Sequence, residues 1–332
     1  MQVSPAVGFP AFADNAATTT VEECEAGGVE LILVALALVT ALPSASGHAD
    51  AALAVGNDVM TSMRKWLNGD PEGRSELETL AVSGRSDAEE ALGEVLGPSG
   101  PQALRDDVAA CGWFAKAAPS RPDSLHNLAL CAEKGVGGTP DLARAAALYR
   151  QAAERGYAKS MCALGNLYVA GRGVPKNEAK GAALCRQAAE LGEPNAQTDL
   201  GDLYVEGVGV PHDMVQARHW YELAAAQGQP NAEFVLGQIY WNGDGVARDR
   251  AKAAELWKAA YKGGRVDAAP LLAAWLFTSW MSAHRAGDLT VLDEAIQYEE
   301  VAVRNASEAK RADEQTLLKI MQAARTGAEK EK

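Results

Sequence analysis

The sequence is short of basic side chains. It holds 31 Lys and Arg against 44 Asp and Glu, which gives a formal net charge of −13 over 332 residues. Nucleic-acid-binding proteins carry a basic patch or stripe, and this sequence supplies none, so we expect no nucleic-acid partner. An acidic balance favours partners that are basic or neutral.

The sequence also lacks the common catalytic and metal-binding motifs. It has no GxSxG elbow, no HExxH pair and no CxxC pair. His212 and His219 lie seven residues apart without a third ligand, which a zinc site requires, so we interpret them as surface residues. The Gly-rich segment 207–210 follows a helical pattern, whereas a phosphate-binding loop follows a strand. We therefore expect no enzymatic activity, no metal site and no cofactor.

The apolar segment 29–42 is shorter than the roughly 20 residues that a membrane-spanning helix needs. It has the length of a signal-peptide core, and small residues near Ser46 and Ala49 offer cleavage sites. The basic residues that normally precede such a core are missing, because the first cation of the chain is Arg64. We predict a cleaved export signal and a periplasmic or secreted protein, with an uncleaved membrane anchor and a buried apolar helix as the alternatives.

What the sequence does contain is a repeat. The segments 158–193, 194–229 and 230–265 follow one another without a gap and share one pattern with a period of 36 residues. A fixed period of this size indicates a stacked-repeat solenoid. Each copy has two stretches with apolar or small residues at helical spacing. We predict a helix–turn–helix unit that buries its apolar faces against its neighbours.

Glycine and capping residues mark the ends of these helices. In the middle copy, Gly201 lies inside the first helix, and its return at the same phase in the other copies predicts a close approach of two backbones. Gly207 directly follows this helix and suits a left-handed cap. Asp213 precedes the second helix, as an N-cap does. The equivalent residues in the flanking copies are Gly165, Gly171, Asn177, Gly237, Gly243 and Asp249.

The core LGxLYxxGxGV, seen at Leu164–Val174, Leu200–Val210 and Leu236–Val246, resembles the Sel-one-like repeats, a branch of the tetratricopeptide-type solenoids. The resemblance implies an all-α fold: a right-handed α-solenoid of about four to five helix-turn-helix repeats of 36 residues, with helical caps.

The pattern fades toward both ends of the array. A degraded copy occupies 122–157, a partial one begins at Val266, and Trp113–Ala118 resembles the second helix of a further unit. We predict an unstructured N-terminus with a signal or anchor at 1–49, a helical extension at 50–109, the solenoid at 110–280 and C-terminal capping helices at 281–332.

Four cysteines follow the predicted signal, and they do not recur at one place in successive repeats: Cys111, Cys131, Cys162 and Cys185. Cys131 and Cys185 occupy positions that are apolar in the other copies, so we interpret them as buried apolar substitutions. A disulfide such as Cys162–Cys185, which export would permit, is the alternative.

Positions that vary while the rest repeats are the candidates for binding. In solenoids the stacked first helices line the concave surface, and the predicted partner-binding residues there are Asn166, Val169, Thr198, Asp202, Glu206, Phe234, Gln238 and Trp241. Phe234 and Trp241 lie two turns apart on one helix, as exposed aromatic anchors do. The alternative is that the partial fifth repeat or the C-terminal cap covers these two rings.

The resemblance implies a non-catalytic scaffold, adaptor or regulator of the bacterial cell envelope, with a protein or peptide partner on the concave face. One alternative is a glycan- or peptidoglycan-binding protein that uses Trp241, Trp275 and Trp280 as aromatic platforms. Another is a cell-wall-related hydrolase, against which the lack of a catalytic motif argues. The sequence specifies neither the partner nor the oligomeric state.

Overall fold

The computed structural model describes residues 56–283 and 289–330, and the regular structure in these ranges is entirely helical. The predicted all-α fold is confirmed. The apolar segment 29–42 and the predicted cleavage sites lie outside the described residues. None of the described helices is both long and apolar enough to cross a membrane.

The helices form successive hairpins, in which a first helix packs against the second helix that follows it. The first helices are α2 (Asn57–Leu67), α4 (Ser86–Leu96), α6 (Pro122–Lys134), α8 (Ala158–Ala170), α10 (Pro194–Glu206), α12 (Pro230–Asn242) and α14 (Ala269–Ser282). The second helices are α3 (Pro71–Val82), α5 (Asp107–Ala117), α7 (Leu142–Glu154), α9 (Glu178–Glu190), α11 (Met214–Ala226), α13 (Arg250–Lys262) and α15 (Leu289–Asn305). The short 3₁₀ helices η2 (Gln102–Leu104) and η3 (Val266–Ala268) and the last helix, α16 (Glu308–Lys330), complete the described chain.

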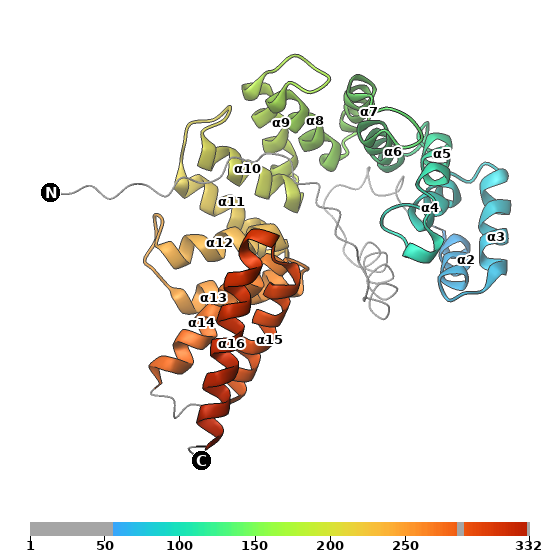
Figure 1. The fold of residues 1–332 in the computed structure, drawn as a ribbon. Helices are drawn as coiled ribbons and strands as arrows, with labels where there is room; N and C mark the ends of the chain where they lie inside the picture. Colours follow the sequence, from blue (N-terminus) through green and yellow to red (C-terminus); the bar gives the residue numbers. More distant parts are fainter. Residues whose placement is uncertain (1–55, 284–288, 331–332) are drawn as a thin grey trace.

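The hairpins are stacked along an arc, with α2, α4 and α6 on its inner side and α3, α5 and α7 outside them (Figure 1). First helices of successive hairpins also contact one another directly: α2 contacts α4, and α8 contacts α10. Closer spacing of the first helices bends the stack toward them. We call the side that the first helices form the inner face.

The residues that begin and end the helices are those that the sequence predicts. Gly171, Gly207 and Gly243 follow α8, α10 and α12 in the left-handed conformation, with φ between 67° and 83°, which glycine adopts at no steric cost. The side chain of Asp213 accepts hydrogen bonds from two backbone N–H groups at the start of α11. Asn177 caps α9 in the same way with one such bond. The connection between the two helices of a repeat is therefore fixed by local chemistry.

The glycine inside α8, α10 and α12 admits the second helix closely, though not always its backbone. A Cβ at Gly165 would lie 2.7 Å from the carbonyl oxygen of Gly181, which confirms a close backbone approach between α8 and α9. A Cβ at Gly201 would instead meet the ring of Tyr221 at 2.6 Å, and Gly237 faces an aromatic ring of α13 in the same way. In these two hairpins the glycine makes room for a large buried side chain.

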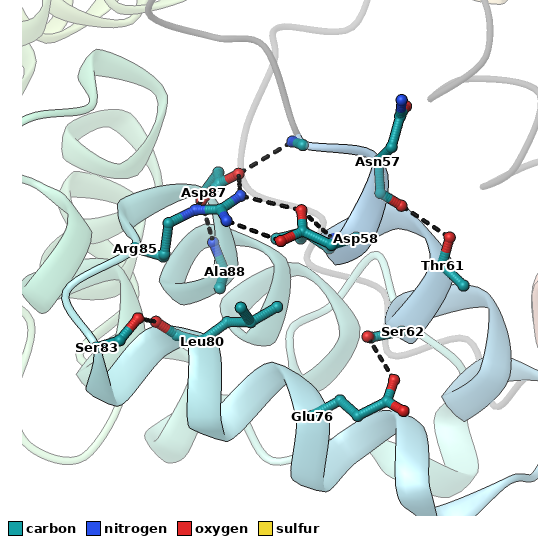
Figure 2. A network of polar contacts seen from close by, with 12 residues as sticks. Asn57, Asp58, Thr61, Ser62, Glu76, Leu80, Ser83, Arg85, Asp87 and Ala88 are labelled. Atoms are coloured by element: carbon teal, nitrogen blue, oxygen red, sulfur yellow. Dashed lines mark hydrogen bonds and ion pairs between the residues drawn. The ribbon is translucent and has the colours of Figure 1, made fainter.

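Charged residues join the helices at the N-terminal end of the array. Arg85 lies between Asp58 at the start of α2 and Asp87 at the start of α4, at 2.8 and 2.6 Å (Figure 2). The hydrogen bonds from Arg85 lower the pKa of Asp87 to about 2. Nearby, the hydroxyl of Ser62 on α2 donates to Glu76 on α3. The first two hairpins are thus linked by polar contacts at their edge.

An apolar core joins the helices at the C-terminal end. Trp280, Leu292 and Met321 come from α14, α15 and α16 and are almost fully buried together. Glu299 of α15 is also fully buried. Burial, followed by the neighbouring Glu314, raises the pKa of Glu299 to about 8. This carboxyl group is therefore mostly protonated at neutral pH.

Candidate binding surface on the inner face

Equivalent positions on the first helices α4, α6, α8, α10 and α12 form two rows along the inner face. Row 1 comprises Glu90, His126, Cys162, Thr198 and Phe234. Row 2 comprises Glu94, Leu130, Asn166, Asp202 and Gln238. The members of a row lie one repeat apart. In row 1, Glu90, Cys162 and Thr198 are almost fully buried, so a partner that lies along the array would meet mainly row 2.

Three predicted residues, Asn166, Asp202 and Glu206, present polar groups in the middle of the array. The side chain of Asn166 is exposed, and its Nδ2 donates to Oδ2 of Asp199 in the next repeat at 2.8 Å. Oδ1 of Asp202 accepts from the hydroxyl of Tyr221 at 2.5 Å, and burial raises the pKa of this carboxyl to about 6. Glu206 is exposed at the end of α10. This part of the inner face is acidic.

The other predicted residues of the middle repeats are less accessible. Thr198 is only 4% exposed, and its hydroxyl donates to the carbonyl of Pro194 in its own helix. Val169 is half-buried and packs against the core that contains Cys162. Gln238 is half-buried on α12. These three residues offer little surface to a partner.

The two predicted aromatic anchors are packed against the helices that follow them. Phe234 and Trp241 are half-buried in a cluster with Trp257. The ring centroid of Trp241 lies 5.2 Å from that of Trp257 and 5.8 Å from that of Trp275 on α14. The guanidinium of Arg265 lies 4.4 Å from the centroid of the Phe234 ring. The helices after α12 therefore cover Phe234 and Trp241, which was the alternative to exposed aromatic anchors.

The three tryptophans considered for glycan binding do not share an exposed platform. Trp280 is 2% exposed and belongs to the C-terminal core. Trp275 meets Trp241 edge to face, at an interplanar angle of 88°. The rings are used for packing between repeats.

All four described cysteines form disulfides. Cys162–Cys185 joins α8 to α9 within one repeat, and Cys111–Cys131 joins α5 to α6 across two repeats. The interpretation of Cys185 as buried is confirmed, but the residue is bridged, so the alternative of a Cys162–Cys185 disulfide is the correct one. Cys185 is equivalent to Tyr221 and Trp257, whose rings contact the first helix in the later hairpins. Its sulfur instead bonds to Cys162, the row 1 residue of α8.

The Cys162–Cys185 bridge is not a metal site. Sγ of Cys162 lies 3.3 Å from Oδ2 of Asp199, and these three residues are the one set within the described ranges whose donor atoms lie close enough to share an ion. Metals bind the thiolate form of cysteine, which a disulfide does not offer.

His212 is exposed, and its Nδ1 lies 2.6 Å from the carbonyl oxygen of Val205.

A second polar cluster, which sequence reasoning missed, lies between α4 and α6. Glu90 is 4% exposed, and its carboxyl accepts from the hydroxyl of Ser124 and from Nδ2 of Asn127, the latter at 2.9 Å. Burial, reinforced by the charge of Asp123, raises the pKa of Glu90 to about 9. The same causes raise the pKa of Glu94, one turn further along α4. The signal in the sequence was the 36-residue period, which places these two glutamates in rows 1 and 2.

A pocket of about 270 Å³ opens beside Glu94, between α4, α5 and α6. Phe114, Leu130 and the Cys111–Cys131 bridge supply apolar wall, and Asn127 supplies a polar group. A more open hollow of about 730 Å³ lies between α2 and α3. The smaller pocket adjoins row 2, because Glu94 and Leu130 belong to its lining.

The fold defines a class: a helical-repeat solenoid. The Sel1 repeat model matches residues 86–118, 122–157, 158–193, 194–229 and 230–264. Since these matches cover more than half of the chain, the protein belongs to the Sel1 repeat family. Proteins of this family generally mediate protein–protein interactions and are typically non-catalytic. The first match begins before residue 110, because α4 and α5 keep the repeat packing without the LGxLYxxGxGV core.

Several solved structures are similar to this chain. A Sel1 repeat protein from Oxalobacter formigenes has a TM-score of 0.58 at 24% identity, over 76% of this chain and 98% of that one. A protective antigen of uropathogenic Escherichia coli with an SLR fold has a TM-score of 0.36 at 24% identity, over 89% and 71% of the two chains. An immunity protein from Pseudomonas aeruginosa has a TM-score of 0.45 at 20% identity, over 72% and 82%. The first of these supports the solenoid fold, and no curated protein matches the sequence.

Proposed function

We propose that this protein is a non-catalytic scaffold or adaptor that binds a protein or peptide partner along its inner face. The observation that carries the proposal is the polar stretch of row 2 between α4 and α10. There Asn166 is exposed and Glu94 and Asp202 are half-buried, whereas on α12 the row 1 residue Phe234 packs into the aromatic cluster.

The charge of this stretch favours a partner with basic side chains. Glu94, Asp199, Asp202 and Glu206 all lie on the inner face, and no cation in the described residues forms an ion pair with any of them. Complementary charge across an interface steers association and selects the partner. A basic segment laid along the first helices would meet these carboxylates in successive repeats.

We also place the protein in the cell envelope, in the periplasm or outside the cell. The two disulfides support this location, because disulfides form and persist in oxidising compartments and are rare in the cytosol. They agree with the export signal that the sequence predicts.

The test is a crosslinking pull-down from native envelopes with matched charge reversals. The inner-face variant carries Asn166→Lys and Glu206→Lys, and the outer control carries Gln187→Lys and Glu190→Lys on α9. All four side chains are exposed. Because Asn166 also donates to Asp199 in the next repeat, circular dichroism must show that both variants are folded before recovery is compared. Each variant changes one amide and one carboxylate to lysine, so their net charges are equal.

We expect wild type and the outer control to recover the same protein and the inner-face variant to lose it. Equal recovery by all three forms would exclude the inner face as the binding surface. We leave Phe234 and Trp241 out of this test because their packing would confound binding with folding.

A further inference from the structure

The pocket beside Glu94 exists because this hairpin departs from the repeat. Gly97 occupies the position that Val169, Val205 and Trp241 occupy in later repeats. In addition, α4 has 11 residues where α6 has 13. A missing side chain and a shorter helix leave open the space that a side chain fills elsewhere.

The size and the walls of the pocket define what fits. Its volume of about 270 Å³ lies just below the range of about 300–1,000 Å³ that holds a drug-sized ligand. The apolar wall formed by Phe114, Leu130 and the Cys111–Cys131 bridge suits an aliphatic stem. A single long side chain meets both conditions.

The charges in the pocket favour a cation at the end of that stem. Arg105 and Asp107 also line the pocket, but they neutralise each other through two hydrogen bonds of 2.9 Å each. Lys134 is exposed. Glu94 is half-buried and is the lining carboxylate without an ion pair among the described residues.

We propose that this pocket binds one lysine or arginine side chain of the protein partner, with its stem on the apolar wall and its cation at the Glu94 carboxylate. This inference rests on the proposed function, since the partner supplies the side chain. Long basic side chains bury their stems on apolar surface in this way while the charge finds a polar group. Burial and Asp123 raise the pKa of Glu94 in the free protein, and a bound cation favours its ionised form.

The test uses small probes on the full chain, followed by two-dimensional amide NMR. The probes are Nα-acetyl-lysine methylamide, the norleucine analogue, which has the stem without the charge, and the glutamate analogue. We expect the lysine probe to shift the amides of Gly97, Ser99 and Asn127 in a saturable way, and the other two probes to leave them unchanged. Equal shifts with norleucine, or stronger ones with glutamate, would overturn the assignment.

Two variants locate the charge. Glu94→Gln keeps the shape of the side chain and, because the site disfavours the charged form, should fold as well as wild type. The affinity of this variant for the lysine probe should be at least tenfold lower than that of wild type. Glu89→Gln makes the same change on α4 outside the pocket lining and should bind as wild type does. Unchanged binding by a folded Glu94→Gln protein would contradict the proposal.

The two proposals fail separately. If capture of a partner depends on Asn166 and Glu206 but the lysine probe does not bind, the pocket assignment is overturned and the proposed function is retained. If the probe binds in a Glu94-dependent way while the inner-face variant still captures its partner, the inner-face function is overturned and the pocket is retained.

Discussion

The two ends of the inner face use the same backbone positions in opposite ways. On α12 the row 1 residue is Phe234 and the residue two turns later is Trp241, and both pack into an aromatic cluster with the next helices. On α4 the same positions hold Glu90 and Gly97, and a pocket remains open between the hairpins. The repeat sets the backbone, and these few variable positions decide whether a stretch of the inner face is filled by packing or left open.

The largest effect should come from removing the aromatic pair. Phe234→Ala with Trp241→Ala should lower the free energy of unfolding by about 3–5 kcal/mol, the range for truncating a single buried aromatic residue, since each ring is only half-buried. Urea denaturation followed by circular dichroism measures this loss. Asn166→Ala with Glu206→Ala, at two exposed positions in the middle of the array, should lower this free energy by less. An equal, small change in both double variants would mean that the aromatic pair is not part of the core.

Loss of the two disulfides should have the next largest effect on stability, and only in the part of the array that contains them. Each closes a loop of similar length, with sequence separations of 20 and 23 between the cysteines, and such a bridge stabilises by about 3 kcal/mol in the chain-entropy model. Reduction should therefore weaken hydrogen-exchange protection in α5–α9 and spare α12–α16, which hold no cysteine. Uniform loss of protection along the array would show that the two ends unfold as one unit.

The glycines inside the first helices should give an intermediate effect at both ends. A Cβ at Gly93 would lie 2.4 Å from the ring of Phe114, and one at Gly237 would lie 2.4 Å from the ring of Trp257. Each Gly→Ala change should cost about 1–3 kcal/mol through overpacking. Gly112→Ala, with no heavy atom within 4 Å of the added Cβ, should instead gain up to about 1 kcal/mol from helix propensity. Thermal denaturation distinguishes the three variants.

The smallest effect concerns pH. Glu90 has a pKa raised to about 9, first by burial and then by Asp123 and Glu94, with Arg121 acting in the opposite sense. A carboxyl whose pKa is raised on folding stabilises the fold fully at low pH and loses that contribution as pH rises toward 9. The loss is at most about 1.4 kcal/mol per pH unit. Glu90→Gln should remove this dependence, and a melting temperature that falls equally in wild type and variant between pH 7 and 8 would contradict the assignment.

The sequence predicted the parts of the fold that depend on local chemistry. The period, the left-handed glycines and the N-caps such as Asp213 are each specified by a few neighbouring residues, and the structure confirms them. It could not predict which surface stays free. Whether Trp241 is exposed depends on where α14 packs, and α14 begins beyond the last regular repeat. The sequence offered the Cys162–Cys185 disulfide only as an alternative, because these residues meet through the packing of α8 on α9, and it did not pair Cys111 with Cys131.

The α4–α5 hairpin shows a different limit. It lacks the LGxLYxxGxGV core, so motif matching placed the start of the array at residue 110. Glu90 and Glu94 were then left outside the candidate site, although the 36-residue period assigns them to rows 1 and 2. The packing of Gly93 against Phe114 preserves the repeat geometry there without the motif.

The central claim is that a partner lies along the polar stretch of the inner face. Site-specific photo-crosslinking in native envelopes tests it most directly, with p-benzoylphenylalanine in place of Asn166 on α8 or of Gln187 on α9, both exposed positions. We expect one partner to be crosslinked from position 166 and not from position 187. Crosslinking of that partner from position 187 alone would place it on the outer face and contradict the account.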